Sequence, residues 1–430
     1  MSKLSRTISF LRRNGMTETF WAVMERMGKW YPDPDQMAAN RYVGKAVDDI
    51  CSKEQVRENY KFSIVVPAYE TDKVYLCEMI DSVVSQTYGK WQLVIADASQ
   101  SNCVKDAVAD YEDGRICYVK LEKNEGISQN TNAALVHADG DYIGLLDHDD
   151  TLHPQALAEM AKMLEKNAYE MIYTDEDKIS HDGSLRFEPN FKPDFNFDFL
   201  LSNNYICHFT VLSRRLMERI SFRPAYDGAQ DYDLFLQAVF EIEKMHKEEC
   251  GNSILNPQTQ ATETYIPYEP AYMKAKIGHV SRILYHWRAN ASSTADNPES
   301  KRYAYEAGKR ALEEFARCNG WDVTVSDTKH LGFYDVTYHP DIFAVRKDVS
   351  AVCGKVVKGN RITEGPRWGN RMLFDGMNAR YSGYMHRAVL KLSVDAYPAG
   401  CVKTRETTGV SEDINTRGRF VYLPDFVVRK

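Results

Sequence analysis

Short apolar runs alternate with amphipathic stretches along the chain from residue 62 onward. The apolar runs have the length of buried strands, and they cover 62–66, 92–96, 116–119, 142–146 and 171–173. Between these runs, apolar residues recur at helical spacing, as at Leu76, Ile80 and Val83 and again over 157–164. An alternation of strand and helix at this pitch predicts a parallel sheet with both faces covered. The first strand is expected to stop at Pro67.

The regular alternation ends after residue 180. Residues 187–199 are aromatic, contain proline and show no period, which favours a substrate-facing loop. A helix follows the segment 227–234, and Asp231 and Asp233 fall in its first turn. A carboxylate there interacts favourably with the helix dipole, so either acid could be purely structural. Further elements are expected at 205–212 and 283–288 (strands) and at 299–318 (a closing helix).

Three carboxylates follow the fourth predicted strand directly, in the sequence Asp147-His148-Asp149-Asp150. Burying acids this close together without a counter-ion would cost several kcal/mol. Asp147 and Asp149 are spaced so that both can reach one hard divalent ion that also holds a diphosphate. The alternative is an acidic strand-to-helix turn, with Asp150 or Thr151 as the N-cap.

Candidate site residues follow three of the predicted strands. Tyr69 comes just after the first strand, Asp97 ends the second, and Asp147 and Asp149 follow the fourth. Because ligands of open parallel sheets bind beyond the carboxyl ends of the strands, these side chains predict a nucleotide-type site. Neither a Gly-x-Gly-x-x-Gly nor a Walker motif is present, so a dinucleotide cofactor or an ATPase is disfavoured. A metal would then have to hold the diphosphate.

Composition narrows the class of protein further. The 430 residues carry a net charge of −7, with 54 basic and 61 acidic side chains, so no general attraction to nucleic acid is expected. The nine cysteines are scattered, with no Cys-x-x-Cys pair, which fits a reducing cytosol rather than a disulfide framework. We expect neither a spanning helix nor a signal peptide, since no apolar run reaches about 20 residues.

The N-terminus combines a basic cluster with an apolar stripe. The basic side chains are Lys3, Arg6, Arg12 and Arg13. The stripe recurs at helical spacing and consists of Phe20, Val23, Met24, Met27, Trp30 and Tyr31. One interpretation is a helix that packs on the main domain. The other is an interfacial helix over residues 1–31 that contacts an anionic membrane.

Several motifs in this order resemble the inverting glycosyltransferases of family 2, which have the GT-A fold. The matching stretches are Ser63-Ile64-Val65-Val66-Pro67-Ala68-Tyr69, Ser82-Val83-Val84-Ser85-Gln86-Thr87-Tyr88, Asn124-Glu125-Gly126-Ile127-Ser128 with Asn132, Leu146-Asp147-His148-Asp149-Asp150, and Gln230-Asp231. The resemblance covers about 62 to 318. The segments 173–178 and 285–288 look like a bacterial branch that builds cell-surface polysaccharides. The fold class expected is therefore α/β, a Rossmann-like, mostly parallel sheet flanked by helices.

The resemblance implies a role for individual residues. Asp231 would be the general base on the acceptor hydroxyl. A divalent metal, Mn²⁺ or Mg²⁺, would be held by Asp149, Asp147 and His286. Tyr69 would pack on the base of the donor and Asp97 would hydrogen-bond it. The whole set implied to bind the nucleotide sugar is Pro67, Tyr69, Glu70, Asp97, Asn124, Gly126, Asn132, Asp147 and His148.

The chain also departs from the family pattern. The second strand often ends in two acids in this family, but here it ends in Asp97-Ala98-Ser99, and residue 70 is Glu where Asn is common. Both departures concern contacts with the donor base. His208 is expected to be a satisfied structural histidine beside a strand, whereas Lys178 and Arg288 could contact either phosphate or solvent.

Three regions are expected: a helical segment over 1–60, the GT-A domain over 61–318, and an α+β extension over 319–430. The extension resembles part of the second domain found in tandem relatives, because 349–358, 380–387, 394–405 and 418–426 look like pieces of it. It has no Asp-x-Asp counterpart, and Glu412-Asp413 is a candidate relic of the base position. The extension is expected to be non-catalytic and to bind acceptor glycan, pack on the first domain or mediate homodimerisation.

The function that this resemblance implies is metal-dependent, inverting transfer of a sugar. The donor would be a UDP- or dTDP-sugar and the acceptor a glycan, lipid-linked, in bacterial surface polysaccharide synthesis. The expected location is cytoplasmic, with a peripheral position on the inner membrane face as an alternative. A sugar nucleotidyltransferase is a competing class, but Pro67-Ala68-Tyr69-Glu70-Thr71 is not its Gly-rich basic loop. A non-catalytic glycan- or nucleotide-binding partner is disfavoured by the intact Asp149 and Asp231.

Overall fold

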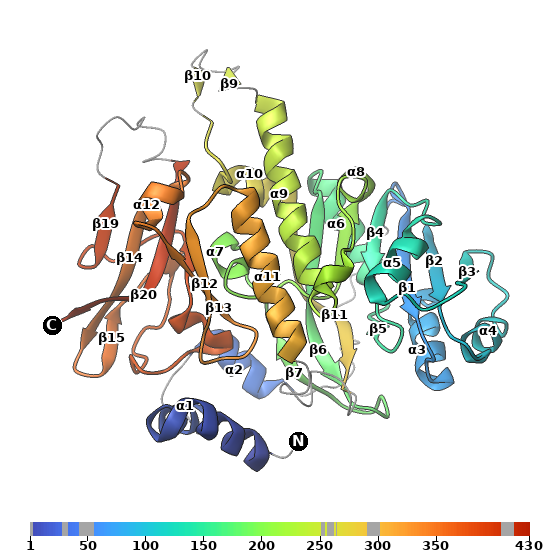
Figure 1. Ribbon diagram of the computed structural model, residues 1–430, viewed down its shortest axis with the longest axis horizontal. Coiled ribbons are helices and arrows are strands. Elements are labelled where there is room, and N and C mark those ends of the chain that lie inside the picture. The colour runs from blue at the N-terminus through green and yellow to red at the C-terminus, as the bar shows by residue number, and fades with distance from the viewer. Residues whose placement is uncertain are drawn as a thin grey trace.

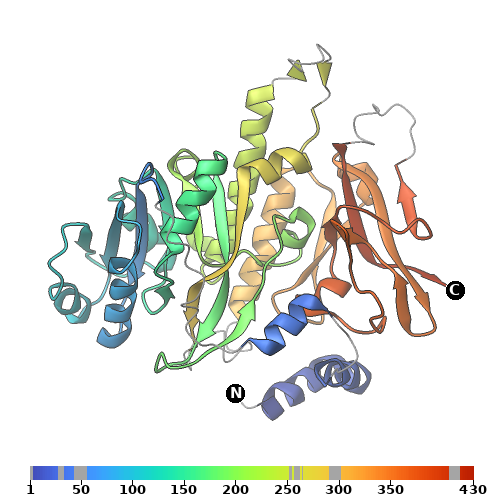
Figure 2. The same cartoon turned by 180° about the vertical axis from the view of Figure 1, so that it is seen from behind.

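A computed structural model describes most of the chain, namely residues 3–27, 33–42, 56–250, 254–255, 262–263, 265–289, 302–405 and 417–430. A large mixed sheet with helices packed on it lies beside a smaller C-terminal sheet (Figure 1). We call residues 61–318 the main-sheet region and residues 319–430 the C-terminal extension. The two N-terminal helices lie along the lower side of the molecule next to the C-terminal extension, as both views show (Figure 2).

The strands of the main-sheet region pair in the order β3-β2-β1-β4-β8-β6-β11-β5, with β7 added to β6. Their bounds are β1 Phe62–Ala68, β2 Trp91–Asp97, β3 Ile116–Lys120, β4 Tyr142–Leu145, β5 Thr151–Leu152, β6 Met171–Ile179, β7 Arg186–Asn190, β8 Thr210–Ser213 and β11 Ile277–Arg288. The α/β class predicted from the alternating pattern is confirmed. The short strands β9 Ile254–Leu255 and β10 Thr262–Glu263 pair with each other away from this sheet.

Helices cover the sheet, and α3, α5, α6, α9 and α11 fall where the sequence predicts helices. The helices of the main-sheet region are α3 Lys73–Val84, α4 Cys103–Val108, α5 Ile127–Leu135, α6 Ala156–Lys166, α7 Phe197–Leu200, α8 Arg214–Met217, the 3₁₀ turn η1 Pro224–Tyr226, α9 Gln230–Cys250, α10 Pro270–Lys276 and α11 Arg302–Cys318. The apolar face of α3, with Leu76, Ile80 and Val83, is buried as its spacing predicts. Helices α9 and α11 pack against each other on one face of the sheet (Figure 1).

Two details of the sheet differ from the sequence-based prediction. Strand β1 does not stop at Pro67 but continues to Ala68, because its pairing with β4 ends at Val65 and only β2 accompanies it further. The missing N–H of Pro67 therefore costs no bond to β4. The second difference is the short antiparallel strand β8, which stands between β4 and β6. The carboxyl ends of β1, β2, β4, β6 and β11 still share one edge of the sheet.

Residues 187–199 are not the open loop that their aromatic, irregular sequence suggests. They begin in β7 and end in α7, and Phe195, Phe197 and Phe199 are buried. These rings belong to a hydrophobic core that the main-sheet region shares with the C-terminal extension. The segment lacks a regular spacing of apolar residues because it is covered on several sides and therefore has no single polar face.

The C-terminal extension forms its own sheet, in the order β15-β14-β20-β18 with β19 added to β14. Its elements are β12 Val323–Asp327, β13 Tyr334–Tyr338, α12 Ile342–Val345, β14 Val349–Lys358, β15 Arg361–Glu364, β16 Arg367–Trp368, β17 Arg371–Met372, the 3₁₀ turn η2 Tyr384–Val389, β18 Leu392–Val394, β19 Val402–Thr404 and β20 Arg419–Arg429. The candidate relic Glu412-Asp413 lies outside the described residues.

The N-terminal helices are α1 Lys3–Arg26 and α2 Pro34–Arg41. Helix α1 is interrupted at Gly15, whose φ is 78°, and it lies against the C-terminal extension. Glu25 accepts hydrogen bonds from the main chain of Ser382 and Gly383. Trp21 and Met24 pack on the shared core, so part of the predicted stripe is a packing face, while Trp30 and Tyr31 lie outside the described residues. No described helix is both long and apolar enough to cross a membrane.

Candidate active site

The residues after β1 and at the end of β2 meet at the carboxyl edge of the sheet. Ala68 is paired with Asp97, so Tyr69 and Glu70 emerge beside the second strand. The backbone N–H of Glu70 donates to Ser99 Oγ at 2.8 Å, and its carboxylate accepts from the N–H of Gln100 at 2.7 Å. These bonds hold the pKa of Glu70 below its usual value, the Ser101 hydroxyl contributing most. Tyr69 remains 44% exposed beside them.

Asp97 is fully buried and already has several hydrogen-bond donors. Its carboxylate accepts from Tyr118 Oη at 2.7 Å, Lys120 Nζ at 3.0 Å and the N–H of Ser99 at 2.8 Å. Burial acts to raise the pKa of Asp97, but these hydrogen bonds outweigh it and the pKa is lowered. Asp97 thus stands as an anion in the place that the sequence predicts, with Lys120 as its counter-ion.

The turn before α5 carries two of the predicted donor-binding residues, Asn124 and Gly126, and α5 itself carries a third, Asn132. Asn124 Oδ1 accepts from the N–H of Gly126 at 3.1 Å. Gly126 adopts a φ of 94°, and a Cβ there would lie 2.7 Å from Asp227 Oδ2, so both the conformation and the space require glycine. Asn132 donates to the carbonyl of Phe222 at 2.8 Å and accepts from its N–H. These contacts join α5 to the segment that precedes η1, and the donor-binding role of Asn132 stays a prediction.

The acid tetrad lies where β4 ends, and Asp150 has a different role from the predicted one. Asp150 is buried and accepts hydrogen bonds from Tyr285 Oη and, at 2.7 Å, from the N–H of Arg288. It therefore binds the end of β11. The predicted helix cap at Asp150 or Thr151 is wrong, because β5 follows directly and α6 begins only at Ala156, after Gln155. Burial raises the pKa of Asp150 well above its usual value.

Asp147, Asp149 and Asp231 come into one another's electrostatic field. Burial raises the pKa of Asp147 most, and the charges of Asp149 and Asp231 raise it further, whereas His208 lowers it. Asp231 is in the first turn of α9 as predicted. Its Oδ2 accepts from Asn204 Nδ2 at 2.7 Å, which fixes the direction of the carboxylate. His148 is partly exposed next to them. The structure thus brings the predicted acids of β4 and α9 together.

A second charged cluster, which the sequence did not predict, lies beside these acids. Glu176 is buried in β6 and accepts from Lys192 Nζ at 3.0 Å and from the N–H of His208 at 3.2 Å. Its pKa falls to about 2, because Lys192 and His208 outweigh the effect of burial. The pKa of His208 rises to about 9, since its bond to Glu176 and the charge of Asp147 outweigh burial. His208 is thus a hydrogen-bonded histidine near a strand, as expected, and its contact with Glu176 favours the charged imidazolium.

His286 lies on the other face of its strand. In β11, Tyr285 pairs with Glu176 and His286 with Asp177, so their side chains point to opposite faces. Tyr285 stacks on His208, with 4.7 Å between the ring centres. His286 Nδ1 instead lies 2.5 Å from Asp177 Oδ1, and burial lowers its pKa. The structure does not bring His286 to the side where Asp147 faces His208.

The acids fit a divalent cation that is completed by a diphosphate. No group of three or more His, Cys, Asp or Glu side chains arranged for a metal occurs within the described part of the chain. Asp147 is partly exposed, and burial together with the charge of Asp149 raises its pKa, whereas His208 lowers it. A bound divalent cation would stabilise the charged form of both acids. Two carboxylates leave most positions around Mg²⁺ or Mn²⁺ to substrate oxygens and water, which is how Mg²⁺ commonly binds with phosphates.

Part of the chain is similar to a known protein family and to proteins of that family. The family model Glycosyl transferase family 2 matches residues 63–223. The uncharacterized protein y4gI of Sinorhizobium fredii is 37% identical over 61% of this chain and 26% of that protein. The O-antigen biosynthesis protein RfbC of Myxococcus xanthus is 30% identical over 61% of this chain and 18% of that protein. The chain thus spans about a quarter or less of the length of these two relatives.

A shorter relative matches over most of its own length. The UDP-Glc:alpha-D-GlcNAc-diphosphoundecaprenol beta-1,3-glucosyltransferase WfgD of Escherichia coli is 29% identical over 45% of this chain and 75% of that protein. Among solved structures, TarS of S. aureus in complex with UDP has a TM-score of 0.39 and 18% identity, over 59% of this chain and 70% of that one. The motif order expected from the sequence agrees with the matched family, and residues 63–223 of the chain are similar to glycosyltransferase family 2.

Proposed function

We propose that the main-sheet region transfers a sugar from a nucleoside diphosphate to a hydroxyl of a glycan, with inversion and with the help of a divalent metal. The proposal is supported by the position of Asp147 and Asp149 directly after β4 and by the electrostatic influence of Asp231, in the first turn of α9, on Asp147. Polysaccharide synthesis is the setting, since the relatives with names of known function build O-antigen or extend a lipid-linked sugar.

The donor occupies the edge between β1 and β4 in this proposal. Tyr69 is exposed enough to stack on the base, and Asp97 lies next to it. Asp149 and Asp147 would hold Mn²⁺ or Mg²⁺, which would supply positive charge to the departing diphosphate. His286 is left out of this site, because its partner is Asp177 on the opposite face of β11. UDP or dTDP is the expected nucleotide.

Asp231 takes the proton of the acceptor hydroxyl as that oxygen attacks the anomeric carbon. The bond from this carbon to the diphosphate breaks on the opposite side, so the configuration inverts. Asn204 holds one carboxylate oxygen of Asp231 at 2.7 Å, which orients the base for proton transfer. His208, charged through its contact with Glu176, adds a fixed positive charge near Asp147.

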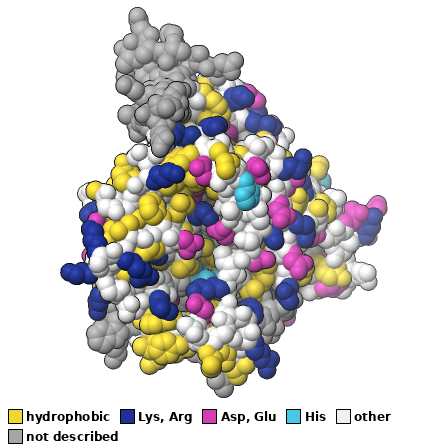
Figure 3. Space-filling view, turned by 60° about the vertical axis from the view of Figure 1, so that its left-hand side comes forward, with side chains coloured by type: hydrophobic (Ala, Val, Ile, Leu, Met, Phe, Trp, Pro, Cys, Tyr) yellow, Lys and Arg dark blue, Asp and Glu magenta, His cyan; other side chains and the backbone are white. Residues whose placement is uncertain are grey.

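A lipid-linked acceptor agrees with the exposed face of α1. Met16 is 82% exposed, Phe20 55% and Met27 69%, although Trp21 of the same helix is packed inward. Hydrophobic side chains gather at the lower end of the molecule, where Figure 1 places α1 (Figure 3). The exposed residues Arg12 and Arg13 precede them on the same helix. Apolar and basic side chains together suit an anionic membrane surface, where a lipid carrier would present its sugar.

Donor binding with and without metal tests the proposal. Thermal stability of the chain is measured with UDP-, dTDP- and GDP-sugars in MnCl₂ and again after EDTA. At least one donor should raise the melting temperature in Mn²⁺ only, because binding to the native state stabilises it. Asp149→Ala should abolish this shift, whereas Asp139→Ala, which removes an exposed acid paired with Lys61 before β4, should not. A shift that survives EDTA or Asp149→Ala would contradict the metal site.

A further inference from the structure

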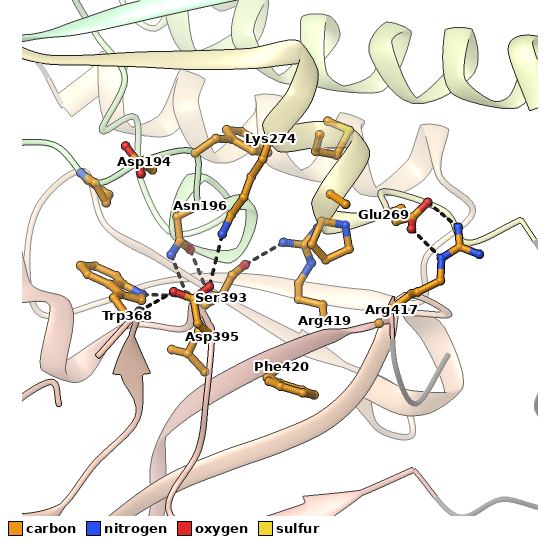
Figure 4. Close-up of a pocket in the computed structure, with 18 residues that line it drawn as sticks. Asp194, Asn196, Glu269, Lys274, Trp368, Ser393, Asp395, Arg417, Arg419 and Phe420 are labelled. Atoms are coloured by element: carbon orange, nitrogen blue, oxygen red, sulfur yellow. Dashed lines mark hydrogen bonds and ion pairs between the residues drawn. The ribbon is translucent and has the colours of Figure 1, made fainter. Parts of the chain in front are cut away.

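A cavity of about 730 Å³ lies between the main-sheet region and the C-terminal extension. One wall is formed by residues 193–196 and α10, and the other by β16, β18 and the start of β20. Lys274 reaches from α10 towards Asp395 of the C-terminal extension, and Trp368 and Phe420 lie on the extension side (Figure 4). We call this cavity the seam pocket. None of the donor-binding or catalytic residues proposed above lines it.

The charges of the seam pocket balance. Its charged lining residues are three acids and three bases, namely Asp194, Glu269, Asp395, Lys274, Arg417 and Arg419. Lys274 Nζ lies 3.2 Å from Asp395 Oδ1, and Arg417 Nε lies 2.8 Å from Glu269 Oε1. Because no charge is in excess, the pocket offers no net attraction to phosphate or to a polyanion. It suits a ligand that is polar and neutral.

Aromatic rings accompany these polar groups. Trp368 and Phe420 are both partly exposed, and Trp368 Nε1 donates to the carbonyl of Ser393 at 2.9 Å, which holds the indole in place. The side chain of Asp194 is 83% exposed and can accept further hydrogen bonds. A rigid aromatic surface beside hydroxyl-binding groups matches a sugar, which has an apolar face of C–H groups and a rim of hydroxyls.

The seam pocket lies close to the catalytic cluster along the chain. Lys192 contacts Glu176, the partner of His208, while Asp194 and Asn196 line the pocket. The four Cα–Cα steps from Lys192 to Asn196 span at most about 14 Å even when the chain is fully extended. A glycan chain of several units that leaves the acceptor site on this side would therefore come within reach of the seam pocket.

We propose that the seam pocket binds neutral sugar units of the acceptor glycan, away from the hydroxyl that reacts. This proposal rests on the function proposed above. A second contact between the protein and the same glycan raises the effective concentration of the acceptor hydroxyl at the catalytic acids. The C-terminal extension then contributes to the choice of acceptor without contributing to the chemistry.

Direct binding of oligosaccharides tests the seam pocket. The full chain is titrated calorimetrically with neutral linear hexasaccharides of glucose, of N-acetylglucosamine and of mannose. At least one should bind, and Lys274→Ala and Phe420→Ala should each weaken it about fivefold or more, since each removes a direct contact. Lys347→Ala removes an exposed lysine of the C-terminal extension that lies outside the seam pocket and donates to the carbonyl of Ala344, so binding should stay unchanged.

Two results would overturn the proposal: none of the three hexasaccharides binds, or both pocket variants bind as the wild type does. Lys274 is half exposed in a surface ion pair, so Lys274→Ala keeps the test valid even where Phe420→Ala fails to fold. Each sample is also titrated with UDP and MnCl₂. If UDP binds but no hexasaccharide does, only the seam-pocket proposal is contradicted. If a hexasaccharide binds but UDP does not, only the proposed donor site is contradicted.

Discussion

The carboxylates at the carboxyl edge of the sheet differ in the hydrogen-bond donors and charges around them. Asp97 and Asp150 accept hydrogen bonds from neighbouring strands, so they act as anchors. Asp147 instead lies in the field of Asp149 and Asp231 on one side and of His208 on the other. The first kind of acid joins strands at this edge, and the second kind is left to bind a ligand. This difference decides which acids of the tetrad we assign to the metal.

The tetrad and the acid of α9 could be predicted from the sequence, because strand ends and helix starts have local signals. The anchoring role of Asp150 could not, since its partner Tyr285 is 135 residues away. The contact between His208 and Glu176 was missed for the same reason, because the two residues are 32 positions apart in the sequence. The only local signal for the pair was the acid-rich segment 173–178 next to a matched motif.

Lys355 gives a test of burial at a single residue. It is buried in β14, with Nζ 3.3 Å from the carbonyl of Ala388, and burial lowers its pKa to about 8. Between pH 8 and the unfolded pKa near 10.4, the unfolded chain therefore binds more protons than the native one, and stability rises with pH. Lys355→Met should be more stable than wild type at pH 7.5, and denaturant titrations should show this gap narrowing by about 1–2 kcal/mol at pH 9.5. A constant gap would contradict the buried charge.

At the scale of elements, the parallel strands and a strand within 205–212 were predictable, but the antiparallel place of that strand, β8, between β4 and β6 was not. Strands β1, β2 and β4 are separated by helices, and this alternation is visible in the sequence. Strand β8 is only four residues long and pairs with β4 and β6 in the antiparallel sense. Nothing local to Thr210–Ser213 specifies those partners, because pairing depends on where distant strands lie.

Helix α1 offers a test of the membrane face. Met16→Ser and Phe20→Ser remove exposed apolar side chains without touching Trp21 or Met24, which pack inward. Together they should reduce sedimentation with anionic phospholipid vesicles several-fold, because membrane affinity scales with buried apolar area. Val136→Ser is the matched control, since Val136 is 81% exposed in the main-sheet region. Equal sedimentation of the double variant and the control would leave α1 as a packing helix only.

At the scale of the whole molecule, one core joins the main-sheet region to the C-terminal extension. Phe197 and Phe199 share it with Val349 and Tyr422. A buried ion pair crosses the same seam, with Arg346 Nη1 3.0 Å from Asp198 Oδ1. The hydrophobic core therefore continues across residue 318, where the motif content of the sequence predicts a domain boundary. The sequence shows where the motifs stop, whereas the extent of packing depends on contacts between distant residues.

Truncation at residue 318 tests this shared core. The deletion would expose Phe197 and Phe199 and leave Asp198 without Arg346, and breaking a buried pair in this way costs about 3–5 kcal/mol. The truncated chain should aggregate on expression or lose its cooperative thermal transition in circular dichroism. A soluble truncated chain that melts within a few degrees of the full chain would show that the C-terminal extension is separable.

The central claim is that Asp231 is the base of a sugar transfer whose donor is bound elsewhere at the same edge. The most direct measurement is transfer from the best-binding donor to a GlcNAc-diphospho-lipid acceptor by Asp231→Asn, with donor binding measured in the same samples. We predict unchanged donor affinity and a fall in transfer of roughly 10²–10⁴-fold, the usual contribution of a general base. Transfer within about tenfold of the wild type, with donor still bound, would contradict the account.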